Sequence, residues 1–222
     1  MAFISVFDVI GPNMIGPSSS HTAGANAIAI LAHKMFGAPL SSVEFTLYGS
    51  FANTYKGHGT DRALLGGAMG FPAHDKRIRD SYNLAERAGL AYRFIVNTTE
   101  TDIYPNTVDM RMEGIDGRTM TVRGESVGGG KVRITRLNGV DVDLDGEYSA
   151  AIIIQKDRPG VVAHITKVLS AHGVNIAFMR LFREAKGQTA YTIVQSDEHL
   201  PDGVAEELRA NPNIQEVMII QR

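Results

Sequence analysis

Three serines, a histidine and a threonine stand next to one another near the N-terminus. Residues 16–24 read Gly-Pro-Ser-Ser-Ser-His-Thr-Ala-Gly, and an alanine-rich helix is predicted over 22–36. A loop of small hydroxyl residues that enters a helix offers N–H groups, hydroxyl donors and the positive end of a helix dipole, which suit a carboxylate or a phosphate. A serine N-cap beside a surface histidine is the alternative, although one serine suffices as a cap. We call these residues the hydroxyl loop: Ser18, Ser19, Ser20, His21 and Thr22.

A second histidine stands between two glycines in residues 49–61, Gly-Ser-Phe-Ala-Asn-Thr-Tyr-Lys-Gly-His-Gly-Thr-Asp. This stretch follows a predicted strand and opens a predicted helix. Flanking glycines let backbone approach a bound group and leave the imidazole unobstructed. The threonine and aspartate could cap the helix, or the aspartate could fix a histidine tautomer. We call these residues the histidine loop: Gly57, His58, Gly59, Thr60 and Asp61.

A glycine triplet forms the third candidate. Gly128, Gly129 and Gly130 follow Ser126-Val127 and lie between two predicted strands. Three glycines in this setting are compatible with a bulge or turn, or with a backbone nest that binds an anion. The turn is the favoured interpretation when the triplet is considered by itself.

Composition excludes several classes of protein. The 222 residues are 44% hydrophobic and 21% charged, which is typical of a globular chain. A net charge of −2 argues against a protein that binds nucleic acid by neutralising phosphates. The chain has no cysteine, so it cannot form a disulfide or a thiolate-held zinc or iron–sulfur site by itself. No apolar run reaches membrane-spanning length and the N-terminus does not resemble a secretory signal, so we expect a cytoplasmic location.

Glycine divides the chain near residue 147, since 19 of the 23 glycines precede it. We therefore expect one domain over 1–147 and another over 148–222. Residues 137–146 are predicted to be a connection or a short strand. In the first domain we expect an α+β fold with a mixed sheet. Its helices are predicted over 22–36, 61–69 and 78–88, and its strands over 43–48, 91–96, 108–112, 119–123 and 131–137.

The second domain has a clearer pattern. Apolar runs predict strands over 148–155, 174–182, 189–195 and 214–220. Helical spacing predicts helices over 161–173 and 201–209. The resulting order, βαββαβ, is that of a ferredoxin-like unit.

These motifs together resemble a known family. Residues 5–24 resemble the N-terminus of the beta subunit of iron–sulfur-dependent L-serine dehydratase, and residues 49–61 and the glycine triplet look like its other two motifs. Residues 148–222 are similar to an ACT domain, an amino-acid-sensing module, whose ligand loop matches Asp157-Arg158-Pro159-Gly160. The resemblance spans nearly the whole chain and implies a serine dehydratase beta or anion-binding type of α/β sandwich followed by an ACT domain.

The resemblance also implies a reaction, the conversion of L-serine to pyruvate and ammonia in amino-acid degradation and gluconeogenesis. The family's 4Fe–4S cluster is expected in a partner alpha subunit, where it would act on the substrate hydroxyl as a Lewis acid. The absence of cysteine fits this division of labour, and the chain is expected to be inactive alone. Elimination also needs a base for the α-proton and donors for the carboxylate. His21 or His58 could provide the base, and the hydroxyl and glycine loops could provide the donors.

The ACT resemblance suggests a second ligand site. The loop after the first strand is expected to receive a carboxylate, and an amide at the second strand is expected to bind either end of a free amino acid. L-serine is the ligand to test, although the domain could instead serve only for self-association. The expected ligand residues are Asp157, Arg158, Pro159, Gly160, Asn175 and Ile176.

A non-catalytic regulatory module is the alternative function. The glycine-rich domain also resembles an anion-binding regulatory domain of some phosphoglycerate dehydrogenases, and an ACT domain beside it would make a sensor. A sensor needs anion donors but not two histidines within long motifs. A pyridoxal-phosphate enzyme is disfavoured because no phosphate cup with a candidate lysine is evident. Expected partners are therefore the alpha subunit and L-serine, with neither nucleic acid nor a membrane.

Overall fold

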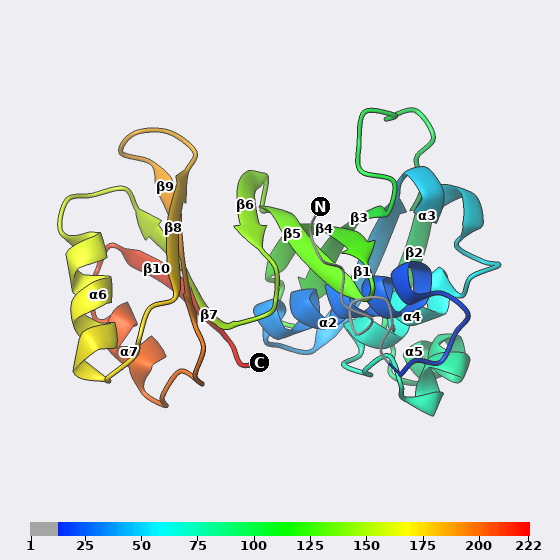
Figure 1. The fold of residues 1–222 in the computed structure, drawn as a ribbon, viewed down its shortest axis with the longest axis horizontal. Helices are drawn as coiled ribbons and strands as arrows, with labels where there is room; N and C mark the ends of the chain where they lie inside the picture. The colour runs from blue at the N-terminus through cyan, green and yellow to red at the C-terminus, as the bar shows by residue number, and fades with distance from the viewer. Residues whose placement is uncertain (1–12) are drawn as a thin grey trace, which may run out of the picture. The chain divides into compact units, whose positions relative to one another are not determined.

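The computed structural model describes residues 13–222, which form two compact units. The first ends at Gly139 and the second comprises Val140–Arg222 (Figure 1). The sequence predicted a boundary after residue 147. Between the two positions lies strand β6, Val140–Leu144, so the segment that was expected to be a connection or a strand is a strand. Among the described residues, no helix is both long and apolar enough to cross a membrane.

The five strands of the first unit lie in a mixed sheet whose full order is β2-β1-β3-β4-β5-β6, and its last strand, β6, begins directly after the unit's boundary at Gly139. Its first two strands are parallel, and β1 pairs antiparallel with β3, β3 with β4, and β4 with β5. The predicted mixed sheet is thereby confirmed. The strands are β1 Leu40–Leu47, β2 Ala91–Val96, β3 Thr107–Gly114, β4 Thr119–Gly128 and β5 Lys131–Leu137, followed by β6.

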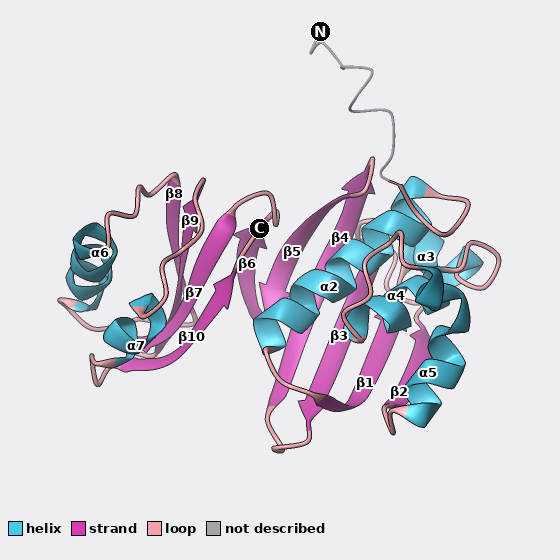
Figure 2. Ribbon diagram, turned by 90° about the horizontal axis from the view of Figure 1, so that it is seen from below, coloured by secondary structure: helices cyan, strands magenta, loops and turns pink. Residues whose placement is uncertain are grey.

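Helices cover one face of this sheet (Figure 2). Strand residues alternate accordingly, and Val43, Phe45 and Leu47 of β1 are buried on the covered face. The predicted helix over 22–36 begins with a π-helical turn, and the predicted helix over 78–88 begins with a 3₁₀ turn. The helical segments are η1 Ser19–Gly24, α2 Ala25–Phe36, α3 Gly49–Thr54, α4 Thr60–Ala68, η2 Lys76–Asp80 and α5 Ser81–Arg87.

Close packing of α2 on α4 fixes the helical layer. A Cβ atom on Gly67 would lie 2.6 Å from the Cβ of Ala29, so only glycine fits at this crossing. Nearby, the buried amide of Asn26 donates to the carbonyls of Ala63 at 3.0 Å and Phe71 at 2.9 Å. Because both loops of interest adjoin these two helices, the crossing sets their separation.

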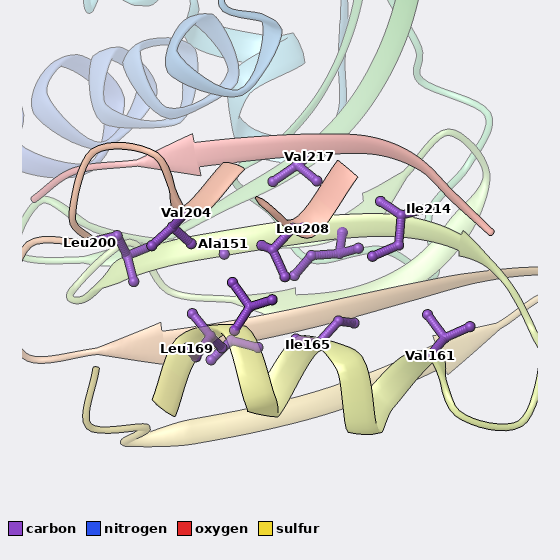
Figure 3. Packing of buried hydrophobic residues seen from close by; sticks show 12 residues of the cluster. Ala151, Val161, Ile165, Leu169, Leu200, Val204, Leu208, Ile214 and Val217 are labelled. Atoms are coloured by element: carbon purple, nitrogen blue, oxygen red, sulfur yellow. The ribbon is translucent and has the colours of Figure 1, made fainter. Parts of the chain in front are cut away.

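The second unit has the predicted order βαββαβ and a sheet in the order β10-β7-β9-β8. Helices α6 and α7 bury apolar residues against one face of this sheet (Figure 3). Strand β8 begins four residues later than expected, because Val174 bonds back to the Leu169 carbonyl and packs on the core. The elements are β7 Ser149–Lys156, α6 Val161–Ala171, β8 Phe178–Arg183, β9 Thr189–Ser196, α7 Val204–Arg209 and β10 Ile214–Ile220.

Candidate active site

The hydroxyl loop folds into the π-helical turn η1 with Ser18 as its N-cap. The Ser18 hydroxyl accepts from the His21 amide at 3.2 Å, and the Ser18 carbonyl accepts from Thr22 at 2.8 Å and Ala23 at 3.4 Å. The sequence predicted that backbone N–H groups of this loop would receive an anion. Three of these amides are instead satisfied by Ser18, so hydroxyl groups remain as the main donors of the loop.

His21 is held from both of its ring nitrogens by serine hydroxyls. Its Nε2 lies 3.0 Å from the Oγ of Ser50, and its Nδ1 lies 3.4 Å from the Oγ of Ser18. A hydroxyl can donate or accept, so both neutral tautomers of the imidazole have partners. The Phe51 ring stands edge-on to the imidazole at 5.3 Å, which further fixes its orientation.

The histidine loop brings His58 against His21. The two ring centroids lie 4.7 Å apart in an edge-to-face arrangement. The Thr22 hydroxyl donates to the His58 carbonyl at 3.0 Å, which ties the two loops together. The Nδ1 atom of His58 is buried without a hydrogen-bond partner in the described chain. The structure therefore unites the two histidines that the sequence singled out, and it leaves one buried ring nitrogen without a partner among the described residues.

Burial and a neighbouring charge act together on His21. Desolvation lowers the pKa of His21 below its usual 6.5, repulsion from His58 lowers it further, and a hydrogen bond to Ser50 opposes the shift. Both effects favour the uncharged imidazole, which is the form that can accept a proton.

Thr60 and Asp61 neither cap the helix nor fix a histidine tautomer. The N-cap of α4 is Gly59, whose φ is 68°, and no side chain caps this helix. The Asp61 carboxylate accepts from the Tyr82 hydroxyl at 2.6 Å and from the Arg62 amide at 2.8 Å. Both oxygens are thus engaged away from the histidines, so the structure provides no tautomer-fixing carboxylate from Asp61.

The glycine triplet forms a tight β-hairpin turn. Gly128 pairs with Lys131 across β4 and β5, which leaves a two-residue loop, and both Gly129 and Gly130 have positive φ. Positive φ at both loop residues is what a type I′ turn requires, so the triplet has a sufficient structural reason. An anion nest would need alternating φ signs, and all three glycines have positive φ. The favoured interpretation as a turn describes this segment.

Ser126, just before the triplet, is the residue by which this third motif reaches the hydroxyl loop. A Cβ atom on Gly24 would collide with the Ser126 hydroxyl and lie 2.8 Å from the Ser126 Cβ. The Ser126 hydroxyl is fully buried and has no hydrogen-bond partner in the described chain. The end of β4 thus packs directly against η1, and the absence of a side chain at Gly24 permits this close approach.

A short segment before β3 joins the second and third motifs. The Pro105 carbonyl accepts from the Ser50 amide at 2.6 Å, and the Asn106 carbonyl accepts from the Ser126 amide at 3.0 Å. Sequence reasoning missed Ser50, Phe51, Asn106 and Ser126, since a lone serine, phenylalanine or asparagine carries no spacing signal. The available signal was position, because Ser50 and Phe51 lie within the motif of residues 49–61 and Ser126 directly precedes the glycine-triplet motif.

This chain does not have the donors to hold an iron–sulfur cluster. The sequence contains no cysteine, and the described residues contain no group of three or more histidine, aspartate or glutamate side chains placed to hold a metal ion. His21 and His58 form a pair, and hydroxyl groups surround them.

The loop expected to bind an amino acid in the second unit is partly occupied by its own contacts. The Asp157 carboxylate accepts from the Gly187 amide at 2.9 Å and pairs with Arg183, and the Gly187 bond is the main cause that lowers its pKa. Asn175 is exposed and precedes β8 instead of beginning it, and Ile176 packs on the core. Helix α6 starts at Val161 with Gly160 as its N-cap, so Arg158 and Pro159 lie in the preceding turn.

Comparison with known proteins finds a matching family model in each of the two units. The family model of the serine dehydratase beta chain matches residues 5–90, and that of the ACT domain matches residues 150–213. The probable L-serine dehydratase beta chain of Bacillus subtilis (strain 168) is 40% identical over 217 residues, which cover 98% of each chain. The L-serine dehydratase beta chain of Peptoniphilus asaccharolyticus is 38% identical over 204 residues, 92% of each chain. The D-3-phosphoglycerate dehydrogenase of B. subtilis is 26% identical over 198 residues, which cover 88% of this chain and 37% of that enzyme.

Proposed function

The chain belongs to the family of L-serine dehydratase beta chains, and from this premise we propose that it supplies the acid–base half of a shared active site. The reaction would convert L-serine to pyruvate and ammonia in a complex with an alpha subunit. The observation that carries the proposal is the pair of His21 and His58, which lie with ring centroids 4.7 Å apart beside serine hydroxyls.

In this proposal His21 accepts the α-proton of serine. Its lowered pKa favours the neutral form that accepts a proton, and its contacts with Ser18 and Ser50 fix the direction of its ring. His58 contributes by raising the cost of a positive charge on His21 before substrate binds. The buried Nδ1 of His58 has no partner in the described chain, and in this proposal it bonds a polar group of the substrate once binding opens the loop.

The substrate carboxylate would be bound by side-chain hydroxyls of the hydroxyl loop. Ser19 and Ser20 are partly buried on η1, next to His21 in the sequence. Since Ser18 satisfies the amides of residues 21–23, hydroxyl groups are the better candidates for donors than the backbone. Hydrogen bonds to a charged carboxylate contribute about 1.5–3 kcal/mol each.

The 4Fe–4S cluster of the proposed enzyme would belong to the alpha subunit. The residues of this chain do not fit such a group, because its thiolate ligands are absent from the sequence. The contribution of this chain is limited to binding, orientation and proton transfer by the residues named above.

Anaerobic co-expression with an alpha subunit of the L-serine dehydratase family tests the proposal. We expect pyruvate formation from L-serine by the pair and none by either chain alone. Stoichiometric iron and serine turnover in this chain alone would contradict the two-subunit arrangement. Absence of turnover by a properly assembled, cluster-loaded pair would contradict the proposed reaction.

A regulatory module remains the second candidate, favoured by the 26% identity with a D-3-phosphoglycerate dehydrogenase over most of this chain. A module of this kind would bind an anion or an amino acid but would not need His21 and His58 in contact. Binding of L-serine by the chain, without pyruvate formation by any assembled pair, would support this candidate over the enzyme.

A further inference from the structure

A partly buried group of polar side chains lies on the sheet face opposite the helices. The Tyr48 hydroxyl donates to the Asp109 carboxylate at 2.8 Å. Arg123 donates to both oxygens of Asp109, at 2.7 Å from Nε and 2.7 Å from Nη2. The same guanidinium lies over the Tyr48 ring at 5.1 Å and reaches Glu100 at 3.5 Å. We call Tyr48, Asp109 and Arg123 the strand clamp, since they join the residue that follows β1 to the neighbouring strands β3 and β4.

Burial separates the strand clamp from ordinary surface ion pairs. The difference lies in the arginines, because Arg123 is only 14% exposed whereas Arg93, which pairs with Glu44 on the same face, is 70% exposed; the carboxylates Asp109 and Glu44 are 24% and 27% exposed. A two-pronged arginine–carboxylate pair holds its geometry more tightly than a single contact does. Burial and the bond to Asp109 raise the pKa of Tyr48 to about 12, so its hydroxyl keeps its proton.

The strand clamp is anchored at the corner where the chain leaves the sheet for the active site. Tyr48 is the N-cap of α3, and the first two residues of that helix are Gly49 and Ser50. Gly49 has a φ of 51°, and a Cβ there would lie 2.6 Å from the Pro105 carbonyl. The corner is therefore tight, and its side-chain anchor is the Tyr48 hydroxyl on the far face.

The same corner carries two of the contacts that orient His21. Ser50 bonds its Nε2, and Phe51 stands edge-on to its ring. Each lies within three residues of Tyr48 on α3, a helix of only six residues. A shift of Tyr48 would be passed to Ser50 because little chain lies between them.

We propose that Tyr48, Asp109 and Arg123 are positioning residues for His21, acting through Ser50 and Phe51 at the β1–α3 corner. This inference rests on the proposed function only for its effect on turnover, because the orientation of His21 exists in the chain by itself. The strand clamp does not touch the reacting groups. It fixes, from the opposite face of the sheet, the element that holds the imidazole.

The test uses Tyr48→Phe, which removes one hydroxyl, and Asp109→Asn, which removes the charge. Glu44→Gln is the matched control, since it breaks an exposed pair on the same sheet face. In the full chain alone, NMR of the His21 ring is expected to show altered chemical shifts and an altered titration midpoint in both clamp variants and unchanged values in the control. Arg123→Lys keeps the positive charge but is also expected to alter the His21 spectrum, because lysine cannot make the two-pronged contact with Asp109.

In the assembled enzyme, kcat is expected to fall about 10- to 100-fold in Asp109→Asn while KM changes little, since misplacement of about 1 Å can cost ~10²-fold. Unchanged His21 spectra in a folded Tyr48→Phe chain would overturn the inference, as would an equal loss of kcat in Glu44→Gln. The NMR experiment uses this chain alone, so it decides the inference even if no assembly with an alpha subunit turns over serine. Failure of the wild-type pair would instead count against the proposed function.

Discussion

Replacing Gly24 by alanine tests the contact between the hydroxyl loop and the third motif. Gly24 has φ −65° and ψ −45°, so alanine introduces no backbone strain and improves helix propensity by roughly 1 kcal/mol. Its new Cβ, however, would meet the Ser126 hydroxyl and lie 2.8 Å from the Ser126 Cβ. Rotation of the hydroxyl can relieve only the first contact, so η1 or β4 must move apart.

We expect Gly24→Ala to lower the free energy of unfolding by about 1–3 kcal/mol, the usual cost of overpacking a filled core. Chemical denaturation followed by circular dichroism measures this change. Gly57→Ala is the matched control, because its nearest neighbour, the Thr54 carbonyl, would be 3.7 Å away. The control is expected to leave stability within roughly 0.5 kcal/mol.

A double-mutant cycle identifies the cause. Ser126→Ala removes only the hydroxyl, whereas Ser126→Gly also removes the Cβ that lies 2.8 Å from the added methyl. Combined with Gly24→Ala, Ser126→Gly is expected to restore more stability than Ser126→Ala, with a coupling of about 0.5–3 kcal/mol. A neutral or stabilising Gly24→Ala, or additive effects in both combinations, would refute the close approach of β4 to η1.

Four further results are expected. His21→Ala and His58→Ala should each lower kcat of the assembled enzyme roughly 10²- to 10⁴-fold without unfolding the chain, and near-normal kcat at equal assembly would make both histidines structural. His58→Phe should raise the pKa of His21 in NMR titrations, because it removes the repulsion from His58. The free energy of unfolding of the wild-type chain should fall as the pH drops below 6.5, because the unfolded state then binds a proton at His21 more readily than the folded state does. Calorimetry of the full chain with L-serine should show binding that weakens in Asn175→Ala, and no heat in either protein would leave the ACT domain an assembly element.

The local sequence pattern was enough to predict the order of elements in the second unit and to single out the two histidines that the fold brings together. The apolar runs and helical spacing of residues 148–222 predict βαββαβ correctly, because the apolar residues of each element follow the pattern of a strand or of a helix and turn residues bound each element. The long motifs around His21 and His58 identified both residues before any contact was known. Both loops are continuous in the chain, so their residue types could be evaluated in place.

Tertiary structure decided which atoms meet. His21 bonds Ser50, which is 29 residues away, and Ser50 lies on α3, a six-residue helix too short to leave a periodic signal. The sequence offered Asp61 as a partner for a histidine, but its position on α4 turns its carboxylate to Tyr82. Spacing along the chain cannot distinguish these outcomes, because they depend on how two helices cross on a sheet.

The amides of the hydroxyl loop show the same limit at closer range. Three serines before a helix predict caps and anion donors equally well, and both uses draw on the same N–H groups. Only the π-helical path of η1, supported by Ser126 beneath Gly24, directs the amides of residues 21–23 to Ser18. Residue types thus determined the chemistry available to this loop, whereas packing between distant segments determined which of its groups remain for a substrate.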